Sequence, residues 1–553
     1  MIGSSRQAVQ GMRRGQEVQV EEGLIPAPTK GVDARSPLSA MDNTNCIYAY
    51  NLVPEEYGLD LRLGYREHQI DAESSAVLGF KTLMVYEGLV SGDTKLFGVT
   101  NEGIWDVTAD AGTPVLKIAF TTDTTADAGH GVFTNYTTDA SASLMFYADS
   151  KNGLYTYTES TNAWTVTAGM TGVTEADVDY VVVHKQRIWL IERGAASAWY
   201  LPVGAIAGAA TQFHFGSKFK HGGALVGLIN WTIDGGQGVD DYLVAVSSGG
   251  DVIPYQGADP AATTDTYGVS WTSVGTYYIG RIPAGRRFHS EYSGELYLLS
   301  SFGLIGMSDI LKGTNIQSTS SRSLTYPIAK LIRKELLSTG ETLGWEPIFL
   351  PSMGKLLITA PPDVSTGEYI QYSMSLTVEG WGFWRGPPIT VAIEWKNKVY
   401  FGTVDGKIFV MDVYRDNLLI DTDAENALGD PIEFSILTSY SDGGSAGTNK
   451  RVQYVRPNFL AVQAPSYQTK VFYDYAIAED TFSFPIAEPT LEAAWDSSLW
   501  DTGLWTGGGL VTEDRLQGAS GMGRSVAVAM RGESAAEAQL VAFEIAWTSG
   551  GFT

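Results

Sequence analysis

The chain has 553 residues, 44% of them hydrophobic, which is enough for two to four packed domains and excludes a disordered protein. Its 62 acidic and 37 basic residues give a formal net charge of −25, which argues against a broad surface that grips phosphate backbones. The 62 glycines and 11% aromatic residues, without an apolar run of membrane-spanning length, favour a turn-rich β protein with few helices and no membrane-spanning segment.

The first residues, MIGSSRQAVQGMRRGQ, are polar and lack the apolar core of a secretory signal. We interpret them as a tail and do not expect export by that route. Cys46 is the sole cysteine, so no intrachain disulfide is possible and its thiol is expected to be a small buried apolar group.

Residues 20–68 follow as an extended segment. Pro26, Pro28 and Pro37 keep its first half extended, and the alternation in LDLRLGY predicts that it ends in a strand. Such a segment has no core of its own and needs a surface to lie on. We therefore treat residues 1–70 as an N-terminal tail and docking arm.

Residues 71–427 contain a recurring pattern of two short apolar strands joined by a turn. Its clearest instance is WKNKVYFGTVDGKIFVMDV at 395–413, where Asp405-Gly406 suits a two-residue hairpin turn. Looser copies bring the number of candidate units to seven, at about 50 residues per unit. The other six are KLFGVTNEGIWDVT (95–108), LMFYADSKNGLYTYT (144–158), RIWLIERGAASAWYL (187–201), YLVAVSSGGDVIPYQ (242–256), ELYLLSSFGLIGMS (295–308) and KLLITAPP with EYIQYSM (355–374).

A single hairpin cannot bury its apolar face, so the units must pack together. Radial closure into a β-propeller does this with few open edges, and a pair of β-sandwiches with similar hairpins is the alternative. Two inserts interrupt the pattern. The segment 256–280 is rich in Gly and Thr, and YPIAKLIRKELLS at 326–338 places Ile328, Leu331, Ile332 and Leu336 on one face of a predicted helix.

Residues 428–553 have longer alternating strands, such as PIEFSILTSYSD, VQYVRPNFLAVQ and TKVFYDYAIAED, which predict a separate β-sandwich-like domain. The segment AAWDSSLWDTGLW between them spaces Trp495, Trp500 and Trp505 five residues apart. That period fits neither a strand nor a helix face, so we expect a loop whose indoles anchor on the domain. A carbohydrate-binding platform is the alternative interpretation of these three tryptophans.

No motif predicts catalysis or a cofactor. The stretch Gly443–Gly447 has the GxSxG spacing of a hydrolase, but its flanks predict a hairpin loop between two strands instead of a strand–turn–helix. The histidines, including His214 and His221, show no metal-ligand spacing, and no phosphate-binding loop is present. A glycosidase pair is assembled in space, so loop acids such as Asp177, Asp179, Asp240 and Asp241 identify none.

The segment 24–68 resembles the N-terminal part of virion tail proteins of short-tailed bacteriophages. In those proteins Gly-φ-Asp/Asn-x-Arg-x-Pro-Leu, where φ is apolar, precedes a Met, an Asn-φ-φ-Pro turn and an Arg-x-Gly-Tyr strand. The matching positions here are Gly31, Asp33, Arg35, Pro37, Leu38, Met41, Asn51, Pro54, Arg62, Gly64 and Tyr65. The C-terminal stretches KRVQYVRPNFLA, WDSSLW, SVAVAMRGE and LVAFEIAWTSGG are similar to the end of the same proteins, so that the two matches cover about 170 residues.

The resemblance implies a tail nozzle or hub subunit, a non-enzymatic structural protein that contains a β-propeller. Such a subunit forms a homohexameric ring, contacts a tail adaptor protein and tail fibres or spikes, and lets DNA pass without specific binding. It implies a location in the virion after assembly in the bacterial cytoplasm, and Arg35, Pro37, Leu38, Asn51, Pro54, Arg62 and Tyr65 become candidate docking residues. The alternative function is a carbohydrate-binding or carbohydrate-degrading propeller, such as a receptor-binding tail component.

Overall fold

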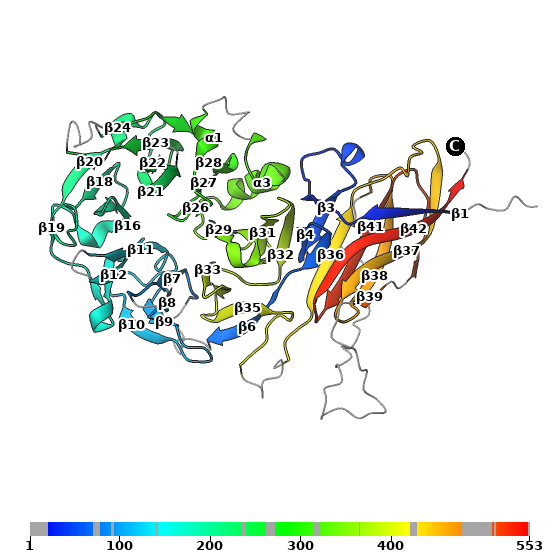
Figure 1. Cartoon of the computed structure of the whole chain (residues 1–553), viewed down its shortest axis with the longest axis horizontal. Helices are drawn as coiled ribbons and strands as arrows, with labels where there is room; N and C mark the ends of the chain where they lie inside the picture. The colour runs from blue at the N-terminus through cyan, green and yellow to red at the C-terminus, as the bar shows by residue number, and fades with distance from the viewer. Residues whose placement is uncertain are drawn as a thin grey trace, which may run out of the picture.

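The computed structural model describes residues 20–69, 78–89, 93–138, 142–234, 239–257, 259–261, 271–312, 321–363, 365–420, 428–476, 511–513 and 516–550. Over these residues the chain is all-β, as predicted, with many separate sheets and few helices. Figure 1 shows small sheets grouped around a centre on one side and two long-stranded sheets on the other.

Each of the seven predicted hairpins is an antiparallel strand pair. Most of their side chains are buried, including all seven of Ser143–Asp149, because these strands are covered on both faces by neighbouring sheets. The pairs are β8–β9 (Lys95–Val99, Gly103–Asp106), β12–β13 (Ser143–Asp149, Gly153–Thr158), β17–β18 (Arg187–Glu192, Ser197–Tyr200), β22–β23 (Val239–Ser247, Asp251–Gln256), β27–β28 (Glu295–Ser300, Gly303–Gly306), β30–β31 (Lys355–Thr359, Ile370–Ser375) and β34–β35 (Lys398–Gly402, Ile408–Val413).

A further strand precedes each hairpin and pairs with its first strand. These are β7 (Thr82–Tyr86), β11 (Gly131–Thr137), β16 (Val178–His184), β21 (Leu225–Asp234), β26 (His289–Tyr292), β29 (Glu346–Leu350) and β33 (Val391–Trp395). Strand β7 contacts β11, β11 contacts β16, and β16 contacts β21. Further on, β21 contacts β27, β26 contacts β29, β29 contacts β33, and β33 returns to β7, so that the small sheets follow one another around the centre seen in Figure 1.

A fourth strand lies at the outer edge of most of these sheets. These outer strands are β10 (Val115–Ala119), β14 (Ala163–Val166), β20 (Thr211–His214), β24 (Thr272–Ser273), β32 (Trp381–Arg385) and β6 (Gly64–Gln69), with β25 (Tyr277–Tyr278) also on β23 and the short pair β15 (Met170–Thr171) and β19 (Gly208–Ala209) between sheets. Neighbouring sheets share cores. One cluster joins Met84 and Phe97 of the first sheet to Tyr147, Tyr157 and Trp164 of the second.

The turn at Asp405-Gly406 differs from the predicted two-residue form. The amide of Thr403 donates to the carbonyl of Lys407 at 3.1 Å, so the connection has three residues, 404–406. Gly406 has a φ of +78°, which fits a three-residue hairpin loop that ends in a left-handed residue. Gly406 is therefore the third residue of a three-residue loop instead of the second residue of a two-residue loop.

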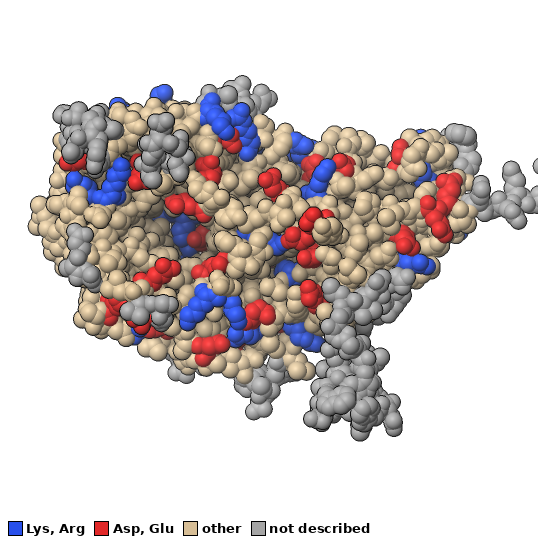
Figure 2. Space-filling model, in the orientation of Figure 1, with Lys and Arg blue, Asp and Glu red and all other residues tan. Residues whose placement is uncertain are grey.

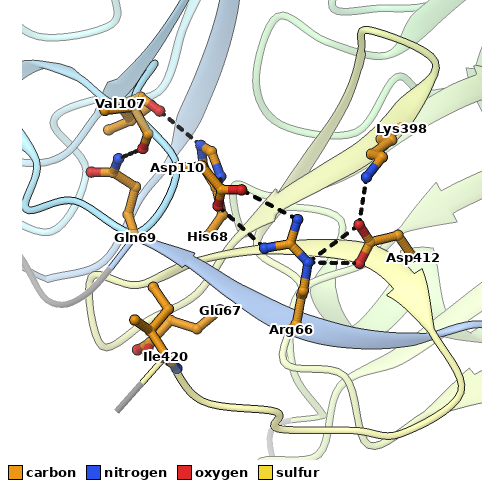
Figure 3. A network of polar contacts seen from close by, with 10 residues as sticks. Arg66, Glu67, His68, Gln69, Val107, Asp110, Lys398, Asp412 and Ile420 are labelled. Carbon is orange, nitrogen blue, oxygen red and sulfur yellow. Dashed lines mark hydrogen bonds and ion pairs between the residues drawn. The ribbon is translucent and has the colours of Figure 1, made fainter. Parts of the chain in front are cut away.

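The last small sheet takes its outer strand from the N-terminal segment, because β6 pairs with β35. Figure 3 shows the side chains that hold this strand: Arg66 Nε lies 3.0 Å from Asp412 Oδ1, and Arg66 Nη1 lies 3.2 Å from Asp110 Oδ1. Asp412 also accepts from Lys398 at 2.6 Å, and the imidazole of His68 lies 3.1 Å from Asp110. Asp110 lies in the connection between β9 and β10 of the first small sheet, and Asp412 lies in the last, so β6 ties the first and last small sheets together.

The predicted helix at 326–338 is confirmed as the 3-10 turn η5 (Tyr326–Ile328) followed by α3 (Ala329–Thr339), which buries Ile328 and Ile332. Within the described residues no helix is both long and apolar enough to cross a membrane. The other helical elements are η1 (Leu38–Ala40), η2 (Glu159–Thr161), η3 (Glu175–Asp177), η4 (Gly216–Lys218), α1 (Met307–Leu311) and η6 (Pro351–Met353).

Two larger sheets form the other part of the molecule, and both combine strands from the two ends of the chain. The first has the order β39-β37-β42-β5-β4, with β1 on β42 and β40 on β37. The second continues the small sheet β29-β30-β31-β32 through β2-β3-β36-β41-β38, so that these nine strands form one sheet. The strands are β1 (Val20–Pro26), β2 (Gly31–Val32), β3 (Asn45–Tyr50), β4 (Leu52–Glu55), β5 (Gly58–Leu61), β36 (Ile432–Thr438), β37 (Asn449–Ala461), β38 (Ser466–Tyr473), β39 (Val511–Glu513), β40 (Gln517–Gly518), β41 (Val526–Ser534) and β42 (Ala538–Gly550).

These two sheets share one hydrophobic core, in which Leu59 and Phe543 of the first sheet are clustered with Phe434 and Met530 of the second. The surface on which the N-terminal segment lies is therefore the C-terminal part of its own chain. It reaches that surface as a set of paired strands because extended backbone buried against a sheet must satisfy its amides and carbonyls.

Candidate functional site

The first part of segment 24–68 includes a loop, residues 33–44, between β2 and β3, drawn in blue in Figure 1. Asp33 Oδ1 accepts from the amides of Arg35 at 2.8 Å and Ser36 at 3.0 Å, and its Oδ2 accepts from the Ser36 hydroxyl at 2.6 Å. Burial raises the pKa of Asp33, but these hydrogen bonds outweigh burial and the pKa is lowered. The guanidinium of Arg35 stacks on the ring of Tyr326 at 4.2 Å. The backbone carbonyl of Arg35 accepts from the Lys330 ammonium, so the loop is fixed against η5 and α3.

The tip of this loop faces solvent. Pro37, which precedes the short helix η1, and Ala40 at the end of η1 are exposed, whereas Leu38 is half-buried and packs against the cluster around Leu437. A turn that is rigid at its base and exposed at its tip can contact another molecule without paying to order itself.

The second part of the segment is buried in a hydrogen-bonded network. Arg62 has no exposed side-chain surface and forms a bidentate ion pair with Asp416, with distances of 2.8 and 2.6 Å. Its Nε donates to Asn51 Oδ1 at 2.9 Å, and Asn51 Nδ2 donates to the carbonyls of Arg385 at 2.8 Å and Glu433 at 2.7 Å. Asn51 also has a φ of +60°, a conformation that asparagine tolerates better than most residues. The network therefore joins the N-terminal segment to both parts of the molecule.

Two more of the matched residues have structural roles beside this network. The hydroxyl of Tyr65 donates to Asn417 Oδ1 at 2.9 Å, and burial raises the pKa of Tyr65. Pro54 is buried on β4 against Gly31 and Gly380, where a Cβ atom on either glycine would lie within 3 Å of the proline ring. Of the seven candidate docking residues, Asn51, Pro54, Arg62 and Tyr65 are thus occupied inside the chain, and Arg35, Pro37 and Leu38 lie on the outer loop.

The other sequence candidates are dispersed. Trp495, Trp500 and Trp505 lie outside the described residues. The stretch 443–447 connects β36 to β37, which belong to different sheets, so it is not the hairpin loop that we predicted. Two local alternating strands look alike in sequence whether or not they pair with each other.

The histidine and carboxylate candidates make ordinary structural contacts. His221 Nδ1 lies 2.7 Å from the buried Asp251, and His214 is exposed on β20. Asp179 is buried and paired with Arg286, whereas Asp177 lies at the surface 3.9 Å from Arg193. Within the described part of the chain, no three metal-ligating side chains lie together.

A central cavity of about 770 Å³ was not foreseen from the sequence. Figure 2 shows the molecule hollowed where the small sheets meet, with acidic and basic side chains inside the hollow. The cavity wall comes from four sheets: His130 and Lys151 of the second, Ser248 of the fourth, the stretch 281–287 before β26, and the stretch 341–345 before β29. Each of these is a loop or strand end, and the sequence gives no sign that they converge.

Comparisons with known proteins add little to this description. No protein-family model matches the chain, and no curated protein matches it. One similar solved structure is the extracellular domain of a putative hybrid two-component system from B. thetaiotaomicron, with 9% identity and a TM-score of 0.36. The match covers 68% of this chain and 44% of that one, so this chain spans less than half of that structure's length.

Proposed function

We propose that this chain is a structural tail protein of a short-tailed bacteriophage, a nozzle or hub subunit that assembles into a homohexameric ring and conducts DNA during ejection. The observation that carries the proposal is the division of segment 24–68 into buried residues and one exposed loop. Its buried residues fasten the chain's own two parts together, and its loop 33–44 is held rigid at Asp33 and exposed at Pro37 and Ala40. Such a loop suits contact with a neighbouring subunit or with a tail adaptor.

The proposal includes a β-propeller for residues 71–427. It is supported by the circuit of contacts from β7 through β11, β16, β21, β26, β29 and β33 back to β7. Closure of a propeller protects the edges of its sheets, and the pairing of β6, a strand from the N-terminal segment, with β35 of the last small sheet supports such a closure.

The charge of the chain is consistent with a DNA conduit. A surplus of 25 negative charges repels phosphates, so DNA passes without being held. The protein would assemble in the host cytoplasm, act in the virion beside tail fibres or spikes, and need no cofactor.

Immunogold labelling of purified phage particles tests the location. We expect label at the distal end of a short tail. Particles that carry no label would contradict the proposal and favour the carbohydrate-binding alternative, which a glycan array would then examine.

A loop variant tests the assembly contact separately. Ala40→Arg places a large cation on the exposed tip of the loop, where it disturbs a docking surface without touching the chain's core. We expect monomers to fold normally and rings to be lost in native mass spectrometry. The matched control is Val166→Arg, on the exposed outer strand β14; equal ring formation by both variants would exclude this loop as the contact.

A further inference from the structure

The wall of the central cavity is rich in basic groups although the chain as a whole is acidic. Lys151, Arg281, Arg286 and Arg287 line it, and Arg287 Nη2 donates to the backbone carbonyl of Lys81 at 2.7 Å. A concentration of cations in one hollow of a chain with net charge −25 is unexpected if charges are only spread for solubility.

Most of these cations have a carboxylate partner. Arg286 is paired with the buried Asp179, and Arg287 Nη1 lies 2.9 Å from Glu346. At the exposed mouth of the cavity, Arg281 is paired with Glu341. These pairs hold the guanidinium groups in place along the wall.

Lys81 and His130 are different. Among the contacts of the described residues, no hydrogen bond or ion pair reaches the Lys81 ammonium or the His130 ring. Burial lowers the pKa of both groups, the charges of Arg287 and Lys81 lower that of His130 further, and Asp127 acts to raise that of Lys81. His130 and Arg287 line the cavity, and the backbone of Lys81 adjoins this part of the wall. The hydroxyl of the next residue, Thr82, donates to the Gly129 carbonyl at 2.6 Å and accepts from the Gly131 amide at 3.2 Å, on either side of His130. A half-buried ammonium without a partner is costly, and a bound anion would offset that cost.

We propose that the central cavity binds a small oxyanion ligand, one that carries a carboxylate or a phosphate group, through Lys81, His130 and Arg287. A guanidinium presents its N–H groups as a planar fork that matches an oxyanion, and an ammonium supplies a compact charge beside it. The neutral imidazole of His130 adds a further N–H donor. A volume of about 770 Å³ suits a ligand of the size of a sugar acid or a nucleotide. This site is separate from the assembly loop and goes beyond the tail function.

The test is calorimetric titration of the whole protein with inorganic phosphate, D-glucuronate and neutral D-glucose at constant ionic strength. We expect saturable binding of phosphate or glucuronate, whichever matches the natural oxyanion, and none of glucose. Lys81→Gln should weaken the binding by about tenfold or more, because a hydrogen bond to a charged group is lost. His130→Leu removes a donor without removing a formal charge, and it is the second variant if Lys81→Gln does not fold.

The matched control is Lys398→Gln. Lys398 lies on β34 of the last small sheet, is paired with Asp412 and does not line this cavity. Its binding should equal that of the wild-type protein. The proposal fails if neither anion binds, if glucose binds as well as the anions, or if Lys81→Gln and His130→Leu bind as tightly as Lys398→Gln. Because loss of ring assembly leaves this titration unaffected, the two proposals fail independently.

Discussion

Replacing Arg62 by methionine should destabilise the protein strongly. All five guanidinium N–H groups have acceptors: two oxygens of Asp416, the side chain of Asn51 and the carbonyls of Leu63 and Arg385. Arg62→Met leaves the Asp416 carboxylate, 12% exposed, without its cation. Removing one partner of a buried ion pair costs about 3–5 kcal/mol, and we expect the free energy of unfolding to fall by that amount.

The measurement is urea unfolding followed by tryptophan fluorescence, for Arg62→Met, Asp416→Asn and the double variant. Because the double variant leaves no unpaired charge, it should lose less than the sum of the two single variants by about 2 kcal/mol. Lys30→Met is the matched control, since Lys30 and Asp42 form an exposed pair at 3.2 Å whose loss should cost less than about 1 kcal/mol. A cost for Arg62→Met as small as that of the control would refute the reasoning.

The further predictions use the same unfolding assay. Gly31→Ala should cost about 2 kcal/mol or more, because Gly31 has a φ of +70° and a Cβ would lie 2.3 Å from the carbonyl oxygen of Trp381; Gly354→Ala, with a φ of +62° and open space, should cost only about 1 kcal/mol. Burial lowers the pKa of His184 and of His289 to about 4. The unfolded chain therefore binds more protons below about pH 6.5, and stability should fall by about 2 kcal/mol per histidine by about pH 5. Replacing both histidines by glutamine should flatten that decline, and an unchanged pH profile would contradict the burial argument.

The hairpins and the helix could be predicted because their signals are local. The alternation in VYFGT and IFVMD, the Gly406 turn and the 3.6-residue spacing of Ile328 and Ile332 each lie within one short window of sequence. The loop length at Asp405-Gly406 was wrong by one residue because Thr403 can either end the strand or begin the turn. A local pattern permits both, and only the pairing of Thr403 with Lys407 decides.

The partners of the strands could not be predicted in the same way. Arg62 and Asp416 are 354 positions apart, and nothing near either residue indicates the other. The same holds for β6 on β35 and for β1 on β42, whose amino-acid patterns fit any sheet with a free edge. The cavity lined by His130 and Arg287 was missed because its wall is assembled from loops and strand ends of different sheets.

These distant pairings have a consequence for the order of folding and assembly. Strands β1–β5 complete the two larger sheets, and β6 completes the last small sheet, so the N-terminal segment cannot order until residues 398–550 have been made. Contacts of such high sequence separation form late, because the entropy of loop closure is lost before they stabilise anything. The loop that holds Arg35 and Pro37 lies between β2 and β3 and takes its final shape at the same step. If the proposed assembly contact lies on that loop, it is available only on a completely folded subunit, and partly folded chains would not enter the proposed ring.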